Sequence, residues 1–242
     1  MEGARQFLAY GMTVDIPEDL AMVLPVPVPP GSADDAVRFV DLSSCPSFLA
    51  DLSDMFPTEY VYPKSFGFQQ APSRSAPKLV VHDVGDFEAS FVPSQKDFDR
   101  LDERFRLPTG VFDQLPRYAD WGFCVFELKP KKRGGFLGLF ARLGGKQTVH
   151  PMAFEFPRRD PSKLFFPTVH VHDGEVHDTA QFDHDLFAQP GSSSTMPPDW
   201  IRSTETTASL AARTKPWVAP DEHVFKRGMH DVHANADVFV DV

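Results

Sequence analysis

The chain has 242 residues, a formal net charge of −10 and a Phe-rich composition, with 23 Phe against 4 Tyr and 3 Trp. A chain of this length can bury roughly 70–75% of its unfolded surface, so it needs no disulfide or metal to fold. The acidic balance argues against a nucleic-acid-binding protein, because such proteins present a basic surface to the phosphates. Cys45 and Cys124 are the only cysteines and lie far apart, which excludes a CxxC zinc or redox motif.

The sequence shows neither a signal peptide nor a membrane span. Residues 1–12 lack a basic region followed by an apolar run of about 7–15 residues. No window approaches the roughly 18 consecutive apolar residues that a transmembrane helix needs. We therefore expect a cytoplasmic protein with no transmembrane segment and no nucleic-acid partner.

The first third of the chain is predicted to form strands joined by proline-rich turns. Strand-like runs span residues 7–16, 21–28 and 36–42, and the prolines of the second run restrict it to a sheet edge or to an extended run like polyproline II. Pro46 fits the first turn of a helix. The apolar residues of that helix recur at helical spacing, namely Phe48, Leu49, Leu52, Met55 and Phe56. Residues 57–77, which contain four prolines, are a predicted loop and a candidate boundary.

The middle of the chain combines a hairpin, a helix and two long strands. Residues 78–85 and 86–93 resemble the two strands of a hairpin, and Ser94 can cap a helix over residues 95–105. The remaining predicted elements are, in order, strands at 121–129 and 148–156 flanking an insertion at 131–147, a hairpin within 163–179, a flexible connection and second candidate boundary at 190–198, a short helix near 205–213, and strands near 223–228 and 236–242.

The order of these elements predicts an α+β fold, mainly antiparallel, with a large sheet or sandwich and two or three packed helices. Strands do not alternate regularly with helices, which disfavours a doubly wound parallel sheet. We expect residues 1–242 to form a single domain.

Several of these segments resemble, in order, an uncharacterised bacterial domain family. The segments are LPVPVP at 24–29, the helix at 94–105, YADWGFCVFELK at 118–129, HPMAFEFP at 150–157 and FFPT at 165–168. Members of that family are usually found on exported or membrane-attached proteins and have no assigned activity. The resemblance covers about half of the chain and implies an architecture only. This sequence departs from the family in lacking an export signal and in carrying a His-rich segment.

The segment 165–187 holds four of the nine histidines. Asp173-Gly174 is typical of a two-residue type I′ hairpin turn, because both central positions need positive φ. Side chains alternate along the paired strands, so one face of the hairpin would carry three imidazoles and a carboxylate. These residues are His170, His172, His177 and Glu175.

This face could hold a divalent metal ion. Directly opposed residues have Cβ atoms about 4.5–5.5 Å apart, so His170 and His177 could share an ion. His172 could join them, and Glu175 could be a fourth ligand or orient a histidine. Neutral imidazoles suit Zn, Ni, Cu or Fe, and the sequence does not choose among these. The alternative is a solvated hairpin face with a structural role.

Other histidines give weaker signals. On a strand, His184 would point away from Asp183 and Asp185, so a dyad among these three residues is not expected. His230 and His233 would face opposite ways on a strand. His150, which precedes Pro151, is expected to be buried at the start of a strand.

The insertion at 131–147 is the one basic segment, with five basic and no acidic residues between 131 and 146. Its apolar residues could form one face of a short helix that docks on a partner or on an anionic membrane surface. The candidate contact residues are Lys131, Lys132, Arg133, Phe136, Leu137, Phe140 and Arg142. The alternative is an apolar loop packed against the body of the protein.

The sequence contains no GxSxG, P-loop, GxGxxG, HExxH or kinase motif. Two hypotheses for the function follow. The first is a non-enzymatic binding protein that uses residues 131–147 as its contact with a protein partner or a membrane surface. The second is a metal-binding protein or metal-dependent enzyme centred on His170, His172 and His177. No catalytic residue is assigned.

Overall fold

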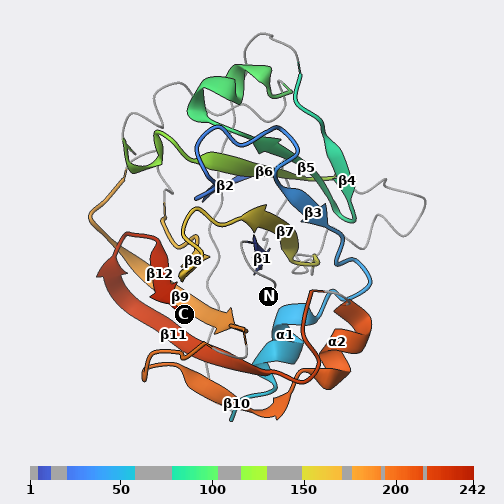
Figure 1. The fold of residues 1–242 in the computed structure, drawn as a ribbon, viewed down its shortest axis with the longest axis vertical. Coiled ribbons are helices and arrows are strands. Elements are labelled where there is room, and N and C mark those ends of the chain that lie inside the picture. The colour runs from blue at the N-terminus through green and yellow to red at the C-terminus, as the bar shows by residue number, and fades with distance from the viewer. Residues whose placement is uncertain are drawn as a thin grey trace, which may run out of the picture.

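The computed structural model describes residues 5–11, 21–57, 78–102, 116–129, 149–170, 176–191, 194–214 and 217–242. Within these ranges the strands form four small antiparallel sheets, accompanied by short helices (Figure 1). The α+β class with mainly antiparallel pairing is therefore confirmed. The strands are divided among several small sheets rather than gathered in one large sheet.

Two of the sheets pack face to face. The first has the order β1–β7–β3, and its strands are β1 (Arg5–Tyr10), β7 (Met152–Pro157) and β3 (Arg38–Val40). The second has the order β2–β6–β5–β4, and its strands are β2 (Ala21–Val26), β6 (Gly122–Leu128), β5 (Phe87–Val92) and β4 (His82–Val84). As the prolines predicted, β2 lies at an edge, and β4 and β5 form the expected hairpin around Gly85, whose φ is +59°.

Alternating side chains explain why the central strands are apolar on both faces. In β6, Cys124 and Phe126 face the core between the two sheets, whereas Phe123 and Val125 face a separate cluster on the outer side. In β7, Phe154 faces the same central core and Ala153 faces the helices. A strand buried on both faces reads in the sequence as a continuous apolar run, as these two do.

The two remaining sheets come from the C-terminal half. One has the order β10–β11–β9, with β10 (Ile201–Thr206), β11 (His223–Ala234) and β9 (Thr179–Ala188). The other pairs β12 (Val238–Asp241) with β8 (Lys163–Phe166). Phe182, Leu186, Met229, Leu164 and Val240 pack between these two sheets.

The helices are short. The predicted helix after Pro46 is present as α1 (Phe48–Ser53), which buries Phe48 and Leu52, and the predicted C-terminal helix is α2 (Ala208–Thr214). The segment after Ser94 is a 3₁₀ helix, η1 (Gln95–Arg100), and a second one, η4, spans Pro116–Tyr118. The Ser94 hydroxyl donates to the Asp97 carboxylate (2.7 Å) and makes no bond to a backbone N–H, so it does not act as the predicted cap.

Candidate functional site

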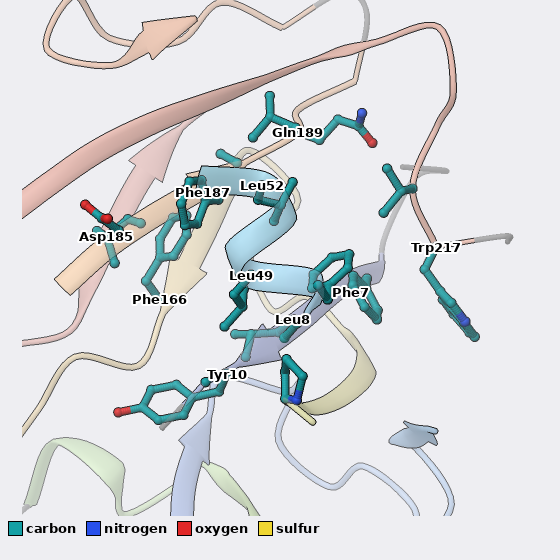
Figure 2. Close-up of a pocket in the computed structure, with 18 of the residues that line it drawn as sticks. Phe7, Leu8, Tyr10, Leu49, Leu52, Phe166, Asp185, Phe187, Gln189 and Trp217 are labelled. Carbon is teal, nitrogen blue, oxygen red and sulfur yellow. The ribbon is translucent and has the colours of Figure 1, made fainter. Parts of the chain in front are cut away.

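An open cavity of about 1310 Å³ lies between β1 and α1 on one side and β9 on the other. Figure 2 shows its walls, where Leu8 and Tyr10 come from β1 and Leu49 and Leu52 come from α1. Ligand pockets are usually about 300–1,000 Å³ and mainly apolar, with a few polar groups that fix the orientation of the ligand. The cavity has this apolar character and exceeds the usual size. The sequence patterns gave no sign of it, because its walls come from segments far apart along the chain.

The apolar wall is built from aromatic rings of separate elements. Phe7 of β1 stacks on Trp217, with ring centroids 5.5 Å apart and an angle of 18° between the ring planes. Phe187 of β9 packs against Phe56 at 5.9 Å. Burial raises the pKa of Tyr10, so its phenol stays neutral around neutral pH. In Figure 2, Asp185 and the Tyr10 hydroxyl lie at one side of the cavity and Trp217 lies at the other.

We call the side formed by Asp183, Asp185 and His230 the acidic end of the cavity. The antiparallel register places His230 of β11 opposite Asp183 of β9, and His230 Nδ1 lies 2.9 Å from Asp183 Oδ1. Its Nε2 lies 3.7 Å from Asp185 Oδ1. A Cβ at Gly228 would lie 2.8 Å from that Nε2, so the glycine permits the ring to lie between the two carboxylates.

At the acidic end, Asp185 has one carboxylate oxygen that accepts no hydrogen bond from the described residues. Its Oδ2 pairs with Lys226 Nζ at 3.0 Å. Its Oδ1 is buried and accepts no hydrogen bond within the described part of the chain. A buried acceptor without a donor costs about 1–3 kcal/mol, so a shift of this carboxylate toward a donor would be favourable.

The other side of the cavity carries two arginines. Arg5 Nε donates to Glu155 Oε1 at 3.0 Å, and Arg38 also pairs with that carboxylate. The Arg38 guanidinium lies 5.7 Å from the centre of the Trp217 ring. Two guanidinium groups share one carboxylate, that of Glu155, so this side of the cavity carries a net positive charge. The side with Asp183 and Asp185 carries the opposite charge.

A second polar cluster is a pair of imidazoles, His170 and His184, of which His184 also lines the cavity. His170 Nε2 lies 2.8 Å from His184 Nε2. The His170 ring stacks on Phe182 with centroids 4.5 Å apart, and the His184 ring meets the edge of Phe182 at 5.5 Å. As expected, His184 turns away from both neighbouring aspartates; its partner is another histidine.

Asn235 fixes the backbone around His170. Its Oδ1 accepts from the His170 N–H at 2.7 Å, and its Nδ2 donates to the carbonyl oxygens of His170 (2.8 Å) and His177 (3.1 Å). The Asn235 N–H also donates to the Asp178 carbonyl at 2.9 Å. One buried amide thus brings the two ends of the 170–177 segment together.

Asp237 secures the residues just before His170. Its Oδ2 accepts from the Tyr118 hydroxyl at 2.6 Å, and its Oδ1 accepts from the N–H groups of Thr168 (3.1 Å) and Val169 (3.4 Å). Burial raises the pKa of Asp237, and the same desolvation is the first cause of the raised pKa of Tyr118. These bonds hold His170 near β9.

Only part of the predicted metal face lies within the described residues. His172, Glu175 and the Asp173-Gly174 turn lie outside the described residues. Residues 167–170 and 176–178 carry no strand, so the flanks of the predicted hairpin are not paired strands where they are described. His177 is exposed there. The described residues contain no group of three or more His, Cys, Asp or Glu side chains suited to a metal ion.

The predicted contact segment 131–147 lies wholly outside the described residues, from Lys131, Lys132 and Arg133 through Phe136, Leu137, Phe140 and Arg142. Its exposure and its partner stay predictions. In the described ranges, no helix is both long enough and apolar enough to cross a membrane.

The nucleophiles of the described residues are poorly suited to catalysis. Burial raises the pKa of the Cys45 thiol and raises that of Cys124 well above its ordinary value, so neither is a ready thiolate. Ser203 Oγ lies 3.3 Å from His223 Nδ1, but this hydroxyl donates to the Glu205 carbonyl instead. His150 is buried before β7, as predicted, and its Nε2 accepts from the Asp86 N–H at 2.9 Å.

Register and distant contacts, rather than motifs, create the two polar clusters. His230 meets Asp183 across strands β11 and β9, and His170 meets His184 from a segment that has no regular structure. The sequence offered one usable signal, the concentration of histidine and aspartate in residues 165–187 and 230–233. It gave no indication of which of these side chains would meet.

Comparisons of this chain with protein-family models, with curated proteins and with solved structures find no match. The resemblance to an uncharacterised bacterial family therefore stays a hypothesis.

Proposed function

We propose that the chain is a non-enzymatic binding protein whose cavity takes an elongated amphipathic molecule with a positively charged end. The observation that carries the proposal is the pair of carboxylates, Asp183 and Asp185, at one end of a cavity with mainly apolar walls. An alkyl or aryl body would cover the rings of Phe7 and Phe187 and the side chain of Leu49. Its ammonium group would donate to Asp185, beside the carboxylate of Asp183.

Charge favours a cation over an anion at this position. Asp183 and Asp185 are opposed by one lysine, Lys226, and both lie beside the His230 ring. A ligand carboxylate would meet two like charges there. A ligand ammonium would gain a charge-assisted hydrogen bond, which is worth about 1.5–3 kcal/mol.

Decylammonium is expected to bind more tightly than decanol, and decanoate more weakly than either, when each is titrated into the protein and the heat is measured. Asp185→Asn should weaken decylammonium binding by about ten-fold or more and leave decanol binding nearly unchanged. Leu49→Trp, which adds a ring inside the cavity, should weaken all three probes.

Asp221→Asn is the matched control, because Asp221 is exposed and does not line the cavity. It removes the same charge and should change none of the three affinities. Equal affinity for decylammonium and decanoate, or equal losses in the Asp185 and Asp221 variants, would contradict the proposed cationic end. Binding unaffected by Leu49→Trp would contradict the cavity itself.

The proposal extends to residues 131–147 as a contact with a protein partner or an anionic membrane surface in the cytoplasm. Its support is the sequence, since five basic residues flank and interrupt an apolar run in a chain of net charge −10. Basic residues near an anionic surface contribute about 1 kcal/mol each, so a segment of this size would bind reversibly.

Deleting residues 134–145 should abolish sedimentation of the protein with vesicles that contain anionic lipid. The proposal assigns the deleted residues to a contact and not to the core, so it expects little change in the thermal unfolding midpoint. A charge-only variant, Lys131→Gln with Lys132→Gln and Arg133→Gln, should lose most of the binding and should mimic high salt. Undiminished sedimentation of the deletion variant would exclude the membrane contact.

A further inference from the structure

We propose that His170 and His184 bind a divalent transition-metal ion through their two Nε2 atoms, with copper and nickel preferred to zinc. This site differs from the predicted hairpin face, because it replaces His172, Glu175 and His177 by a residue of strand β9. It does not rest on the proposed cavity ligand, although His184 also lines the cavity.

The spacing of the two nitrogens supports shared coordination. Metal–imidazole bonds are about 2.0–2.1 Å long, so two nitrogens on one ion are about 2.9 Å apart at a right angle and about 3.3 Å apart at the tetrahedral angle. The observed separation between the two Nε2 atoms is 2.8 Å. The observed N–N distance therefore already suits a right-angled pair once the rings turn toward a common ion, whereas a tetrahedral pair needs that distance to grow by about 0.5 Å.

The right-angled arrangement decides the choice of metal. Tetragonal coordination by nitrogen and oxygen is typical of Cu(II) and Ni(II), and zinc sites are usually tetrahedral. Copper also heads the affinity series for nitrogen ligands among divalent first-row metals. Solvent would complete the coordination, since both imidazoles are only partly buried.

Both rings are held in place before any ion arrives. Phe182 supports the His170 ring face to face and the His184 ring on its edge. Asn235 holds both the N–H and the carbonyl of His170. Such supporting contacts raise metal affinity because the ligands lose little freedom on binding.

The same distance fits a direct N–H···N hydrogen bond between two neutral imidazoles, in which no metal takes part. Metal titration distinguishes the two arrangements. If His170 and His184 only hydrogen-bond to each other, the protein takes up no ion. If they coordinate, the ion replaces the hydrogen bond between the two rings.

The experiment uses tag-free, full-length protein freed of metal by a chelator and titrated with Cu²⁺, Ni²⁺ and Zn²⁺. We expect one Cu²⁺ per chain at micromolar concentration and an electron paramagnetic resonance spectrum with nitrogen splitting. Zn²⁺ should bind at least ten-fold more weakly. His170→Ala and His184→Ala should each weaken Cu²⁺ binding at least ten-fold.

His177→Ala is the control that separates this site from the predicted hairpin face, because His177 is exposed and is not one of the two proposed ligands. It should leave the affinity for Cu²⁺ unchanged. The inference is overturned if wild-type protein takes up no Cu²⁺, or if the His184 variant binds as well as wild type. It is equally overturned if His177→Ala removes the site, which would restore the hairpin set. The nitrogen splitting is measured on wild-type protein, so the test stands even if a variant fails to fold.

Discussion

Replacing Phe154 by alanine is expected to lower the free energy of unfolding by about 3–5 kcal/mol. Phe154 lies on β7, is fully buried, and faces the core between the two central sheets. The centroid of its ring lies 5.9 Å from that of Phe126 in the opposite sheet and 6.0 Å from that of Phe156 in its own strand. Removing it leaves a cavity where the two sheets meet, and rigid strands on both sides limit collapse around the gap. Urea unfolding followed by tryptophan fluorescence measures the loss.

Phe239→Ala is the matched control for this prediction. Phe239 is also on a strand and contacts Trp121 and Phe165, yet its exposed fraction is 45%. The same change in volume should cost less than half as much there, because the side chain is already partly in water. Phe154→Leu should lie between the two. Equal losses at Phe154 and Phe239 would show that the interface between β6 and β7 is not the main core.

The fold class was predictable because the apolar patterns typical of strands can be recognised from short segments of sequence. The run from Trp121 to Lys129 reads as a strand buried on both faces, and β6 occupies almost the whole of it. The apolar spacing of Phe48 and Leu52 correctly placed α1, but Pro46 lies before the N-cap residue Ser47 and not in the first turn as predicted. Pairing was not predictable, since strands β6 and β7, which follow one another as described elements, lie in different sheets. Local sequence determines which residues are extended, and burial of distant residues determines which strands pair.

The candidate sites were much less predictable than the fold. The sequence singled out His170 for its place among clustered histidines and expected it to share an ion with His177. In the structure Asn235 holds both backbones while the ring of His170 meets His184. The predicted strand ends at Phe166, because β8 pairs with only four residues of β12 and then leaves the sheet. Alternation with a period of two residues tells which face a side chain lies on only as long as the residues form a strand.

The cavity could not be predicted from local patterns at all. Its acidic end depends on the register between β9 and β11, where a shift of one residue would move His230 away from Asp183. Gly228 is needed for the ring position, yet in the sequence it is only the last residue of the strand predicted near 223–228. Charges of opposite sign thus reach opposite sides of one apolar space through tertiary packing alone.

Asp237→Ala is expected to lower the free energy of unfolding by about 2–4 kcal/mol, because three donors lose one acceptor. The Tyr118 hydroxyl is the most costly of them, since Tyr118 is 1% exposed and water cannot replace the carboxylate. The N–H groups of Thr168 and Val169 are released at the same time. The variant should also weaken Cu²⁺ binding, because these residues hold His170. Chemical unfolding and metal titration of the same preparation measure both effects.

Asp237→Asn removes the charge of this side chain and keeps an oxygen that can accept hydrogen bonds. The raised pKa of Asp237 also predicts how the stability difference between this variant and wild type changes with pH. Burial raises the pKa of Asp237 above its ordinary value of 3.8, so the folded state binds the proton more tightly than the unfolded chain. The stabilisation from the protonated form is complete below pH 3.8 and is lost as the pH rises through the folded pKa. The stability of Asp237→Asn relative to wild type should therefore increase with pH across that window. A decrease would mean that bonds from Tyr118 and the backbone outweigh desolvation and lower the folded pKa.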